Sequence, residues 1–370
     1  MTELKRRNRI LSLDVFRGIT VAAMIFVNIT ASADAIPYFL HHAEWEGLYF
    51  GDLVFPFFLF IGGISMAFAF ANKKNKSLKQ QWSHFISRII ILFVLGVFIN
   101  WIWDPTSLNV RIPGVLQLIA LSSLFAAPFA KNKSRWILLV ASILILVNSI
   151  IFLYVKISHA QPGTSDHFMN IMGWIDVQTF GSNHILNSNF DPEGILALIP
   201  STVLLLLGLT LGRTLQNNGE NNKTLLQLFI AGILALLIGF ILSYWIPLVK
   251  QLWTSSFILI TAGLGTLIFS ILYFYLDIKK IKSILLITLP LGRNALFIYI
   301  LSMIVMVLIE CYVMIPCSDG SLISLYEYIF SYDIPFLGPM CEQILFGLLF
   351  VLFYMVIAAV LHRKKIYIKL

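Results

Sequence analysis

Residues 53–71 read LVFPFFLFIGGISMAFAFA, an apolar run without a charged side chain. A helix needs about 20 apolar residues to cross the roughly 30 Å hydrocarbon core of a bilayer, so this run predicts a transmembrane helix. The rest of the chain has the same character, because 59% of its 370 residues are hydrophobic, 12% are charged and the mean hydropathy is +0.87. Soluble globular domains are less apolar, and the sequence therefore predicts an all-α polytopic membrane protein.

Ten runs of this kind predict about ten transmembrane helices. They cover 13–30, 53–71, 85–103, 112–130, 136–155, 195–211, 225–245, 253–276, 294–315 and 344–361. Pro290 and Gly292 interrupt the long apolar region 281–313, so we expect a short interfacial or re-entrant piece before the ninth crossing. We expect a single transmembrane domain over residues 1–370, with ordered outer loops at 156–194 and 316–342.

The lysine and arginine residues alternate with these runs in a way that predicts topology. All but three of the 26 basic residues fall on one side, which must be cytoplasmic; the exceptions are Arg111, Lys156 and Lys250. Both termini should then be cytoplasmic. The net charge of +8 reflects this topology, so we expect no nucleic-acid partner.

Several polar residues lie where lipid would reject them. Asp14 and Arg17 are three apart and share a helical face, which is typical of a structural ion pair or of a ligand contact. Asn28 lies near the outer end of the same run, where an interhelical hydrogen bond is the simpler interpretation. Gln117, Asn294 and Tyr299 are open to the same two interpretations.

The outer stretch at 41–52, HHAEWEGLYFGD, has the strongest chemical signature. His42 and Glu46 are four apart, and Asp52 directly precedes the run at 53–71. A histidine oriented by a carboxylate can act as a general base or a nucleophile near neutral pH, and interfacial hydrogen bonding is the alternative. No His-x-x-x-His or similar ligand spacing occurs among the outer histidines, so we expect no metal site.

Six motifs in order resemble the transmembrane acyltransferases related to heparan-α-glucosaminide N-acetyltransferase. They are LSLDVFRGITVAAMIFVN, HAEWEGLYFGDLVFPFFLFIGGISMA, RIPGVLQ, FDPEGILALIPS, KQLWTSSFIL and PLGRNALFIY. The resemblance runs over nearly the whole chain. It implies acetyl transfer from cytosolic acetyl-CoA to an amino sugar, or a related glycan, on the opposite side of the membrane, without a metal.

The resemblance also assigns particular residues. The active histidine of the family lies in a His-Ala-x-Trp-x-Gly motif, which singles out His42, and the motif partners Asn28 and Asp52 are implied beside it. Asp14 and Arg17 match Asp-x-Phe-Arg-Gly. The chain departs from the family where Leu118 replaces a frequent arginine, and it has no large lumenal domain before the first run, which leaves the acceptor sugar open.

Each ligand has an expected set of binding residues. For acetyl-CoA these are Arg17 and Arg293 at the phosphates, with Asp14, Asn294 and Gln117; topology alone is the alternative for Arg293. For the acceptor they are Trp45, Glu46, Arg111, Asp191, Glu193, Lys250 and Trp253. His42 is either the base for direct transfer or an acetylated carrier, Asn28 an oxyanion donor, and Asp52 the support of the imidazole.

The main alternative is a membrane transporter of sugars or cell-wall fragments, which ten helices and a broken helix would suit. We expect an integral protein of the bacterial inner membrane with its active site open to the outer face. The bilayer and the acceptor glycan are expected partners, and so is a second copy of the chain in a homodimer. Cys317 and Cys341 are either bonded to each other or free.

Overall fold

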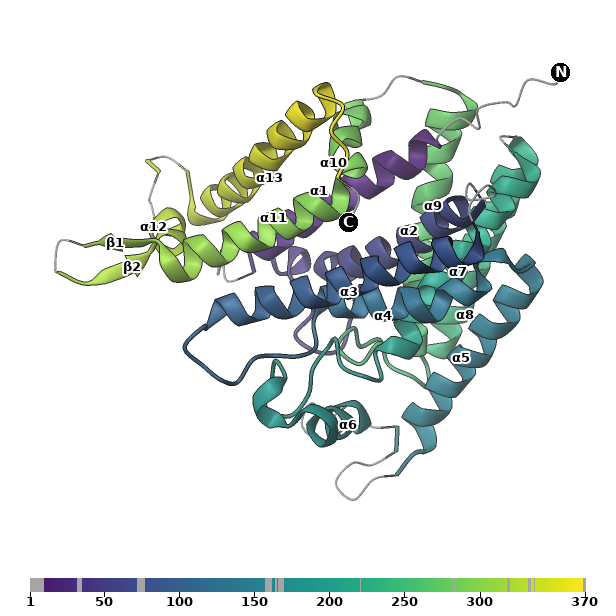
Figure 1. The fold of residues 1–370 in the computed structure, drawn as a ribbon, viewed down its shortest axis with the longest axis horizontal. Helices are drawn as coiled ribbons and strands as arrows, with labels where there is room; N and C mark the ends of the chain where they lie inside the picture. The colour runs from purple at the N-terminus through teal and green to yellow at the C-terminus, as the bar shows by residue number, and fades with distance from the viewer. Residues whose placement is uncertain are drawn as a thin grey trace.

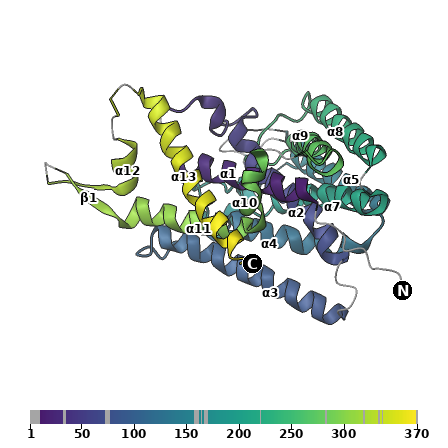
Figure 2. The same ribbon diagram turned by 90° about the horizontal axis from the view of Figure 1, so that it is seen from above.

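The computed structural model describes residues 10–31, 35–71, 77–156, 162–163, 165, 170–219, 221–281, 284–317, 320–331, 334–335 and 337–368. These residues form a bundle of long helices (Figures 1 and 2). The α-helices are α1 (Leu11–Ile29), α2 (Phe50–Ala71), α3 (Leu78–Trp103), α4 (Val115–Ala126), α5 (Ser134–Tyr154), α6 (Ile171–Phe180), α7 (Leu198–Asn218), α8 (Asn222–Leu242), α9 (Ser255–Tyr273), α10 (Leu289–Arg293), α11 (Ala295–Val307), α12 (Leu325–Phe330) and α13 (Pro339–Arg363). One antiparallel hairpin joins β1 (Met314–Pro316) to β2 (Leu322–Ser324).

Within the described ranges, nine helices are long and apolar enough to cross a membrane. Each of the ten predicted runs contains a helix, and the prediction of an all-α polytopic membrane protein is confirmed. The run at 112–130 differs in length, because α4 passes into the 3-10 helix η2 (Ala127–Lys131) and together they form a shorter apolar helix over Val115–Lys131. A 3-10 helix rises about 2.0 Å per residue, so this segment extends further than an α-helix of equal length.

The centre of the bundle consists of α1, α2, α7 and α9. Between 67% and 72% of the residues in their apolar windows are buried, against 11–28% in α3, α5, α8 and α13, which turn apolar side chains outward as lipid-facing helices do. The backbones of α2 and α7 approach closely at two glycines. A Cβ on Gly63 would lie 2.1 Å from the Leu205 carbonyl oxygen, and one on Gly208 would lie 2.0 Å from that of Phe60.

The interruption around Pro290 takes the form of short helices. The 3-10 helix η5 (Ile284–Thr288) leads into α10, which ends at Arg293, and α11 begins after Asn294. The predicted short piece before the ninth crossing is therefore present. Pro290 lies in the first turn of α10, where its missing N–H costs no hydrogen bond.

The start of α1 is held by a residue from another helix. The N-cap residue, Ile10, provides no side-chain cap. Instead Asp277, at the end of the α9 region, accepts hydrogen bonds from the N–H groups of Leu11 (2.8 Å) and Ser12 (3.0 Å). A carboxylate at a helix N-terminus satisfies free N–H groups and complements the helix dipole, so this contact fixes α1 against α9.

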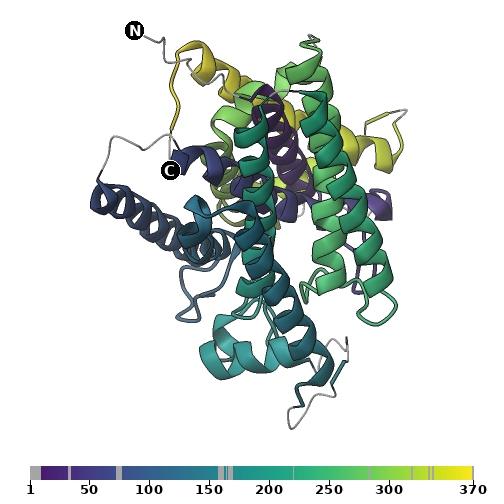
Figure 3. The same cartoon turned by 90° about the vertical axis from the view of Figure 1, so that its right-hand side faces the viewer.

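The polar connections lie at the ends of the bundle. Figure 3 shows α6 and its neighbouring loops, in teal, at the end opposite the start of α1 and the C-terminal segment. The structure describes only parts of the segments 156–194 and 316–342, so order over their full length stays a prediction. Cys311, Cys317 and Cys341 are all free thiols, so the Cys317–Cys341 disulfide is not formed.

Candidate active site

The loop before α2 presents His42 beside a buried carboxylate. The Nδ1 atom of His42 lies 2.9 Å from Oδ1 of Asp52, whose side chain is fully buried. The other oxygen of Asp52 accepts hydrogen bonds from the N–H groups of Ala43 (3.1 Å) and Tyr49 (2.9 Å), which hold the carboxylate in place. An ionised Asp52 requires the imidazole proton on Nδ1, and Nε2 is then left with a lone pair for chemistry.

The electrostatic surroundings favour neutral His42. Partial burial lowers the pKa of His42, the charge of Lys250 lowers it further, and Asp52 and Glu193 oppose these effects. The side chain nevertheless remains 41% exposed, so a ligand can reach it. A neutral, accessible imidazole with a fixed orientation can act as a general base or as a nucleophile.

The connection between α8 and α9 holds the loop that carries His42. The N–H of Gly47 donates to the carbonyl of Leu248 (2.8 Å), and the side-chain amide of Gln251 donates to the carbonyl of Ala43 (3.0 Å). Lys250 lies in this same connection between α8 and α9. These bonds place Lys250 near enough for its charge to act on His42, although the two residues are more than 200 positions apart in sequence.

Trp253 lies in the connection between α8 and α9 and is fully buried. Its indole N–H donates to the carbonyl of Pro192 (2.7 Å), and its ring packs edge-on against Phe55 with centroids 5.7 Å apart. The backbone of Trp253 has a φ of 47°, which is uncommon for a side chain of this size. In this conformation Trp253 ties the outer loops together and has no exposed face for a ligand.

Arg111 joins two carboxylates of the long outer segment. Its Nε and Nη2 atoms bind the two oxygens of Asp191 at 2.8 and 2.7 Å, and Nη2 also lies 2.5 Å from Glu193. Burial opposes the charge on Arg111, but the two carboxylates outweigh this effect and raise its pKa. The sequence predicted these three residues as ligand contacts, and the structure brings them together as one ion-pair network.

Asp176 supports this network and was missed in the sequence. It lies on α6, is fully buried, and accepts hydrogen bonds from the N–H groups of Asp191 (3.2 Å) and Ile195 (3.0 Å). Burial raises the pKa of Asp176 to about 7, and the charge of Asp191 adds to this effect. The only signal in the sequence is a carboxylate within the apolar segment Trp174–Val177.

Trp45 and Glu46 contact the same outer segment at another point. The Trp45 indole N–H donates to the carbonyl of Ser165, and the Ser165 hydroxyl donates to Glu46. The ring of Trp45 also packs edge-on against Phe190, with centroids 5.4 Å apart. Glu46 is exposed, so of these two residues it is the more accessible to a ligand.

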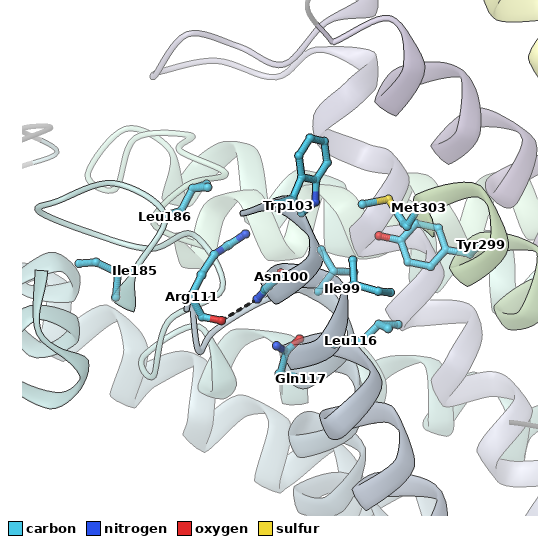
Figure 4. Close-up of a pocket in the computed structure, with 12 residues that line it drawn as sticks. Ile99, Asn100, Trp103, Arg111, Leu116, Gln117, Ile185, Leu186, Tyr299 and Met303 are labelled. Atoms are coloured by element: carbon cyan, nitrogen blue, oxygen red, sulfur yellow. Dashed lines mark hydrogen bonds between the residues drawn. The ribbon is translucent and has the colours of Figure 1, made fainter. Parts of the chain in front are cut away.

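A cavity of about 470 Å³ lies between α3, α4 and α11, with Arg111 on its wall (Figure 4). Arg111 and Gln117 are the predicted site residues on its wall. The other lining residues are Gly96, Ile99, Asn100, Trp103, Val115, Leu116, Ile185, Leu186, Tyr299 and Met303. Asn100 was also missed in the sequence; its amide donates to the carbonyls of Arg111 (2.9 Å) and Pro113 (2.8 Å).

Asn28 adjoins this cavity. Its side-chain amide donates to the sulfur of Met303 (3.3 Å), a weak acceptor on the cavity wall. Among the described residues, Asn28 has no hydrogen bond to His42 or Asp52. Asn28 also forms a hydrogen bond with the side chain of Tyr299. An amide N–H of this kind is a donor that a developing oxyanion can use.

The opposite end of the bundle holds a second cluster of charge. Asp14 pairs with Arg17 at 3.3 Å and lies 3.7 Å from Arg293. Arg17 also donates to the Gly292 carbonyl (3.1 Å) and to the Ser65 hydroxyl. Arg88 on α3 is exposed and close enough for its charge to act on that of Arg17, and it was missed because a topological role explained it.

Arg293 and Asn294 also bind the C-terminal segment. The Asn294 side chain donates to the carbonyl of Ile366 (3.2 Å) and accepts from the N–H of Ile368 (2.9 Å). The guanidinium of Arg293 lies 6.0 Å from the ring centroid of Tyr367. Both residues, predicted to bind the donor, are thus engaged in holding the end of the chain beside α10.

Within the described part of the chain, no group of three or more histidine, cysteine, aspartate or glutamate residues could hold a metal ion.

The chain is similar to known proteins over most of its length. Residues 9–246 match the family described as heparan-alpha-glucosaminide N-acetyltransferase, catalytic. Two curated proteins named heparan-alpha-glucosaminide N-acetyltransferase are similar to the chain. The mouse protein (Mus musculus) is 26% identical over 364 residues, 81% of this chain and 54% of its own length. The human protein (Homo sapiens) is 28% identical over 350 residues, 79% of this chain and 52% of its own.

The chain therefore spans about half the length of the curated relatives it matches. The matched region includes His42, Asp52, Arg111 and Asp191, and ends before Lys250. With the family match over residues 9–246, the motifs and the fold lead to one conclusion: the chain belongs to the heparan-alpha-glucosaminide N-acetyltransferase catalytic family.

Proposed function

We propose that this protein transfers an acetyl group from acetyl-CoA to an amino sugar, or a related glycan, on the outer side of a membrane. The observation that carries the proposal is the His42–Asp52 pair, an accessible imidazole 2.9 Å from a fully buried carboxylate, inside the region that matches the family. The distribution of lysine and arginine supports an orientation with His42 outside. A bacterial inner membrane stays the expected location.

Asp52 orients the imidazole of His42 for this reaction, and partial burial keeps the imidazole neutral. In direct transfer, Nε2 of His42 takes a proton from the acceptor amine while the amine nitrogen attacks the thioester carbon. The carbon–sulfur bond then breaks, and the leaving thiolate receives the proton from the imidazolium. Asp52 keeps the second ring proton on Nδ1 throughout and stabilises the imidazolium, as the buried carboxylate of a catalytic triad does.

In the covalent route Nε2 itself attacks the thioester, releases the CoA thiolate and passes the acetyl group to the acceptor. Asn28 serves either route by turning its amide from the Met303 sulfur to the developing oxyanion. An acetylated His42 detected by mass spectrometry without acceptor, and lost on addition of amino sugar, would favour the carrier. Sequential kinetics without such an adduct would favour direct transfer.

The cluster of Arg17, Arg88 and Arg293 is proposed to bind the phosphates of acetyl-CoA at the inner end of the bundle. Arg17 and Arg293 lie 3.3 and 3.7 Å from the carboxylate of Asp14, and the charge of Arg88 acts on Arg17. Arginine binds phosphate oxygens by paired hydrogen bonds. Asn294 then acts on this site through the C-terminal segment, whereas Gln117 belongs to the outer cavity.

The acceptor is proposed to approach from the outer loops, where Glu46, Glu193 and Asp191 provide negative charge for an amino group. Lys250 sits beside His42 and can bind acceptor oxygens. Trp45 packs at the edge of this surface, while Trp253 shapes it from below. Homodimer formation stays a prediction.

Purified protein with labelled acetyl-CoA and a panel of amino sugars tests the proposal. We expect labelled N-acetyl sugar from the wild type and none from His42→Ala. His41→Ala is the matched control and should keep activity, because His41 contributes its backbone carbonyl to the loop, in a bond from the Gly51 N–H (3.1 Å). Uptake of sugar into vesicles without acetyl transfer would instead support the transporter alternative.

A further inference from the structure

The side chain of Tyr299 lies on the wall of the cavity between α3, α4 and α11. Figure 4 shows its hydroxyl directed from α11 toward Ile99 on α3. The residue is only 3% exposed, so the phenol is almost fully removed from solvent. A buried hydroxyl that faces a cavity can donate a hydrogen bond to a group bound there, and the reaction described so far makes no use of it.

The amide of Asn28 orients this hydroxyl. It donates to the sulfur of Met303 (3.3 Å) and forms a hydrogen bond with the side chain of Tyr299. Met303 follows Tyr299 by one turn of α11, so one face of that helix provides both contacts. An NH2 group has two hydrogens, and the one not used by the sulfur can be donated to the phenol oxygen. The O–H hydrogen of Tyr299 then points into the cavity.

Charged neighbours connect Tyr299 with the reacting histidine. The charges of Glu193 and Arg111 act on Tyr299. The charge of Glu193 acts on His42 as well, so one carboxylate is close to both side chains. Among the described residues that line the cavity, the charged one is the cation Arg111, and none is a carboxylate. A negative charge that develops beside Tyr299 therefore meets a hydroxyl donor and no carboxylate on the wall.

We propose that the hydroxyl of Tyr299 is a catalytic hydrogen-bond donor to the thioester oxygen, and that Asn28 positions it. The inference rests on the proposed function, and it adds a second donor beside the Asn28 amide. Asn28 does not line the cavity, whereas Tyr299 does. Tyr299 is therefore the better placed of the two to touch a thioester held in the cavity.

The hydroxyl acts while the tetrahedral intermediate exists. When the nucleophilic nitrogen attacks the thioester carbon, the π electron pair of the C=O bond moves to oxygen, and the O–H of Tyr299 donates to this oxyanion. The pair returns to form the carbonyl as the carbon–sulfur bond breaks and the thiolate leaves. Tyr299 keeps its proton throughout, so it serves both direct transfer and the acetyl-His42 route. A donor fixed in a water-excluded site stabilises such a charge strongly, because it needs no reorganisation.

Tyr299→Phe tests the proposal, since it removes one oxygen and keeps the ring. We expect kcat for transfer to an amino sugar to fall about 10²-fold, with the KM values for acetyl-CoA and sugar changed less than about twofold. Tyr326→Phe is the matched control. Tyr326 is also buried, and its hydroxyl donates to the carbonyl of Ile29 (3.0 Å), the residue after Asn28. This variant should keep the kcat of the wild type, whatever its thermal unfolding temperature in detergent.

The positioning role of Asn28 is tested in the Asn28→Ala background. There the hydroxyl has lost its partner, so Tyr299→Phe should lower kcat by less than about tenfold further. An undiminished 10²-fold loss in that background would overturn the role of Asn28. A kcat of Tyr299→Phe within twofold of the wild type, or an equal loss in Tyr326→Phe, would overturn the Tyr299 donor and leave the proposed function standing. No transfer by the wild type would remove the proposed function itself, and this inference with it.

Discussion

The two charged ends of the bundle are built in opposite ways. At the outer end, carboxylates outnumber their cationic partner, since one arginine, Arg111, binds both Asp191 and Glu193. At the inner end, arginines gather around a carboxylate, since Arg17 and Arg293 lie 3.3 and 3.7 Å from Asp14 and the charge of Arg88 acts on Arg17. The proposed reaction requires such a difference, because it takes an anionic donor at one end and delivers the acyl group to a neutral or cationic acceptor at the other.

The largest expected effect is at the outer end. Asp52→Asn keeps the size of the side chain but removes the charge that holds the proton on Nδ1 of His42. We expect kcat to fall roughly 10³- to 10⁴-fold, with little change in the KM for acetyl-CoA, since the equivalent change in serine proteases lowers kcat about 10⁴-fold. Steady-state kinetics at fixed pH measure this. A loss confined to the KM for acetyl-CoA would contradict the outer location of the chemistry.

A second effect concerns folding of the outer end. Arg111→Gln leaves the buried carboxylate of Asp191 without its cation, and breaking a buried pair costs about 3–5 kcal/mol. We expect a clear decrease in the thermal unfolding temperature in detergent. Lys250→Gln is the control, because Lys250 has no ion pair within the described residues. Equal melting of both variants would show that the network contributes no stability.

The inner end is tested by Arg17→Gln. Loss of one phosphate-binding charge should raise the KM for acetyl-CoA about 10- to 100-fold and leave the KM for the sugar nearly unchanged. Arg363→Gln, which removes an exposed basic residue of the same end, should change neither value. If Arg17→Gln altered only the KM for the sugar, the assignment of the two ends would be reversed.

The stability of the outer end should also depend on pH, because of Asp176. Asp176 has a folded-state pKa of about 7, above its ordinary value of 3.8, so between these values the folded state binds more protons than the unfolded state. Stability should therefore fall as pH rises from about 4 to 7, by at most roughly 1.4 kcal/mol per pH unit. Thermal unfolding across this range should lose that slope in Asp176→Asn, and an unchanged slope would assign it to another group.

The smallest effect is expected from Asn294→Ala. It removes two hydrogen bonds to the C-terminal segment, each worth about 1 kcal/mol, and frees that segment from α10. Limited proteolysis should then cleave the C-terminal segment faster, while kcat stays within about twofold of the wild type. If kcat fell as far as in Asp52→Asn, the segment would have a direct part in the reaction.

Much of this molecule follows from local sequence. The positions of the helices follow from the length of the apolar runs, because a bilayer admits only segments that satisfy their own backbone hydrogen bonds. Family membership followed from motifs that contain His42 and Asp52. The approach of these two residues, ten apart in the chain, was suggested by motif and not by helical spacing, since the loop between them is not a regular helix.

The tertiary structure decided which polar residues meet. Arg111 binds a carboxylate 80 residues away, Asp277 caps a helix that begins more than 260 residues earlier, and Asn294 serves the C-terminal segment. No periodicity connects such positions, because the contacts depend on how whole helices pack. The sequence by itself thus determined that the chain crosses a membrane and carries a histidine–carboxylate pair. Packing alone decided which charges that pair faces and where a ligand has room.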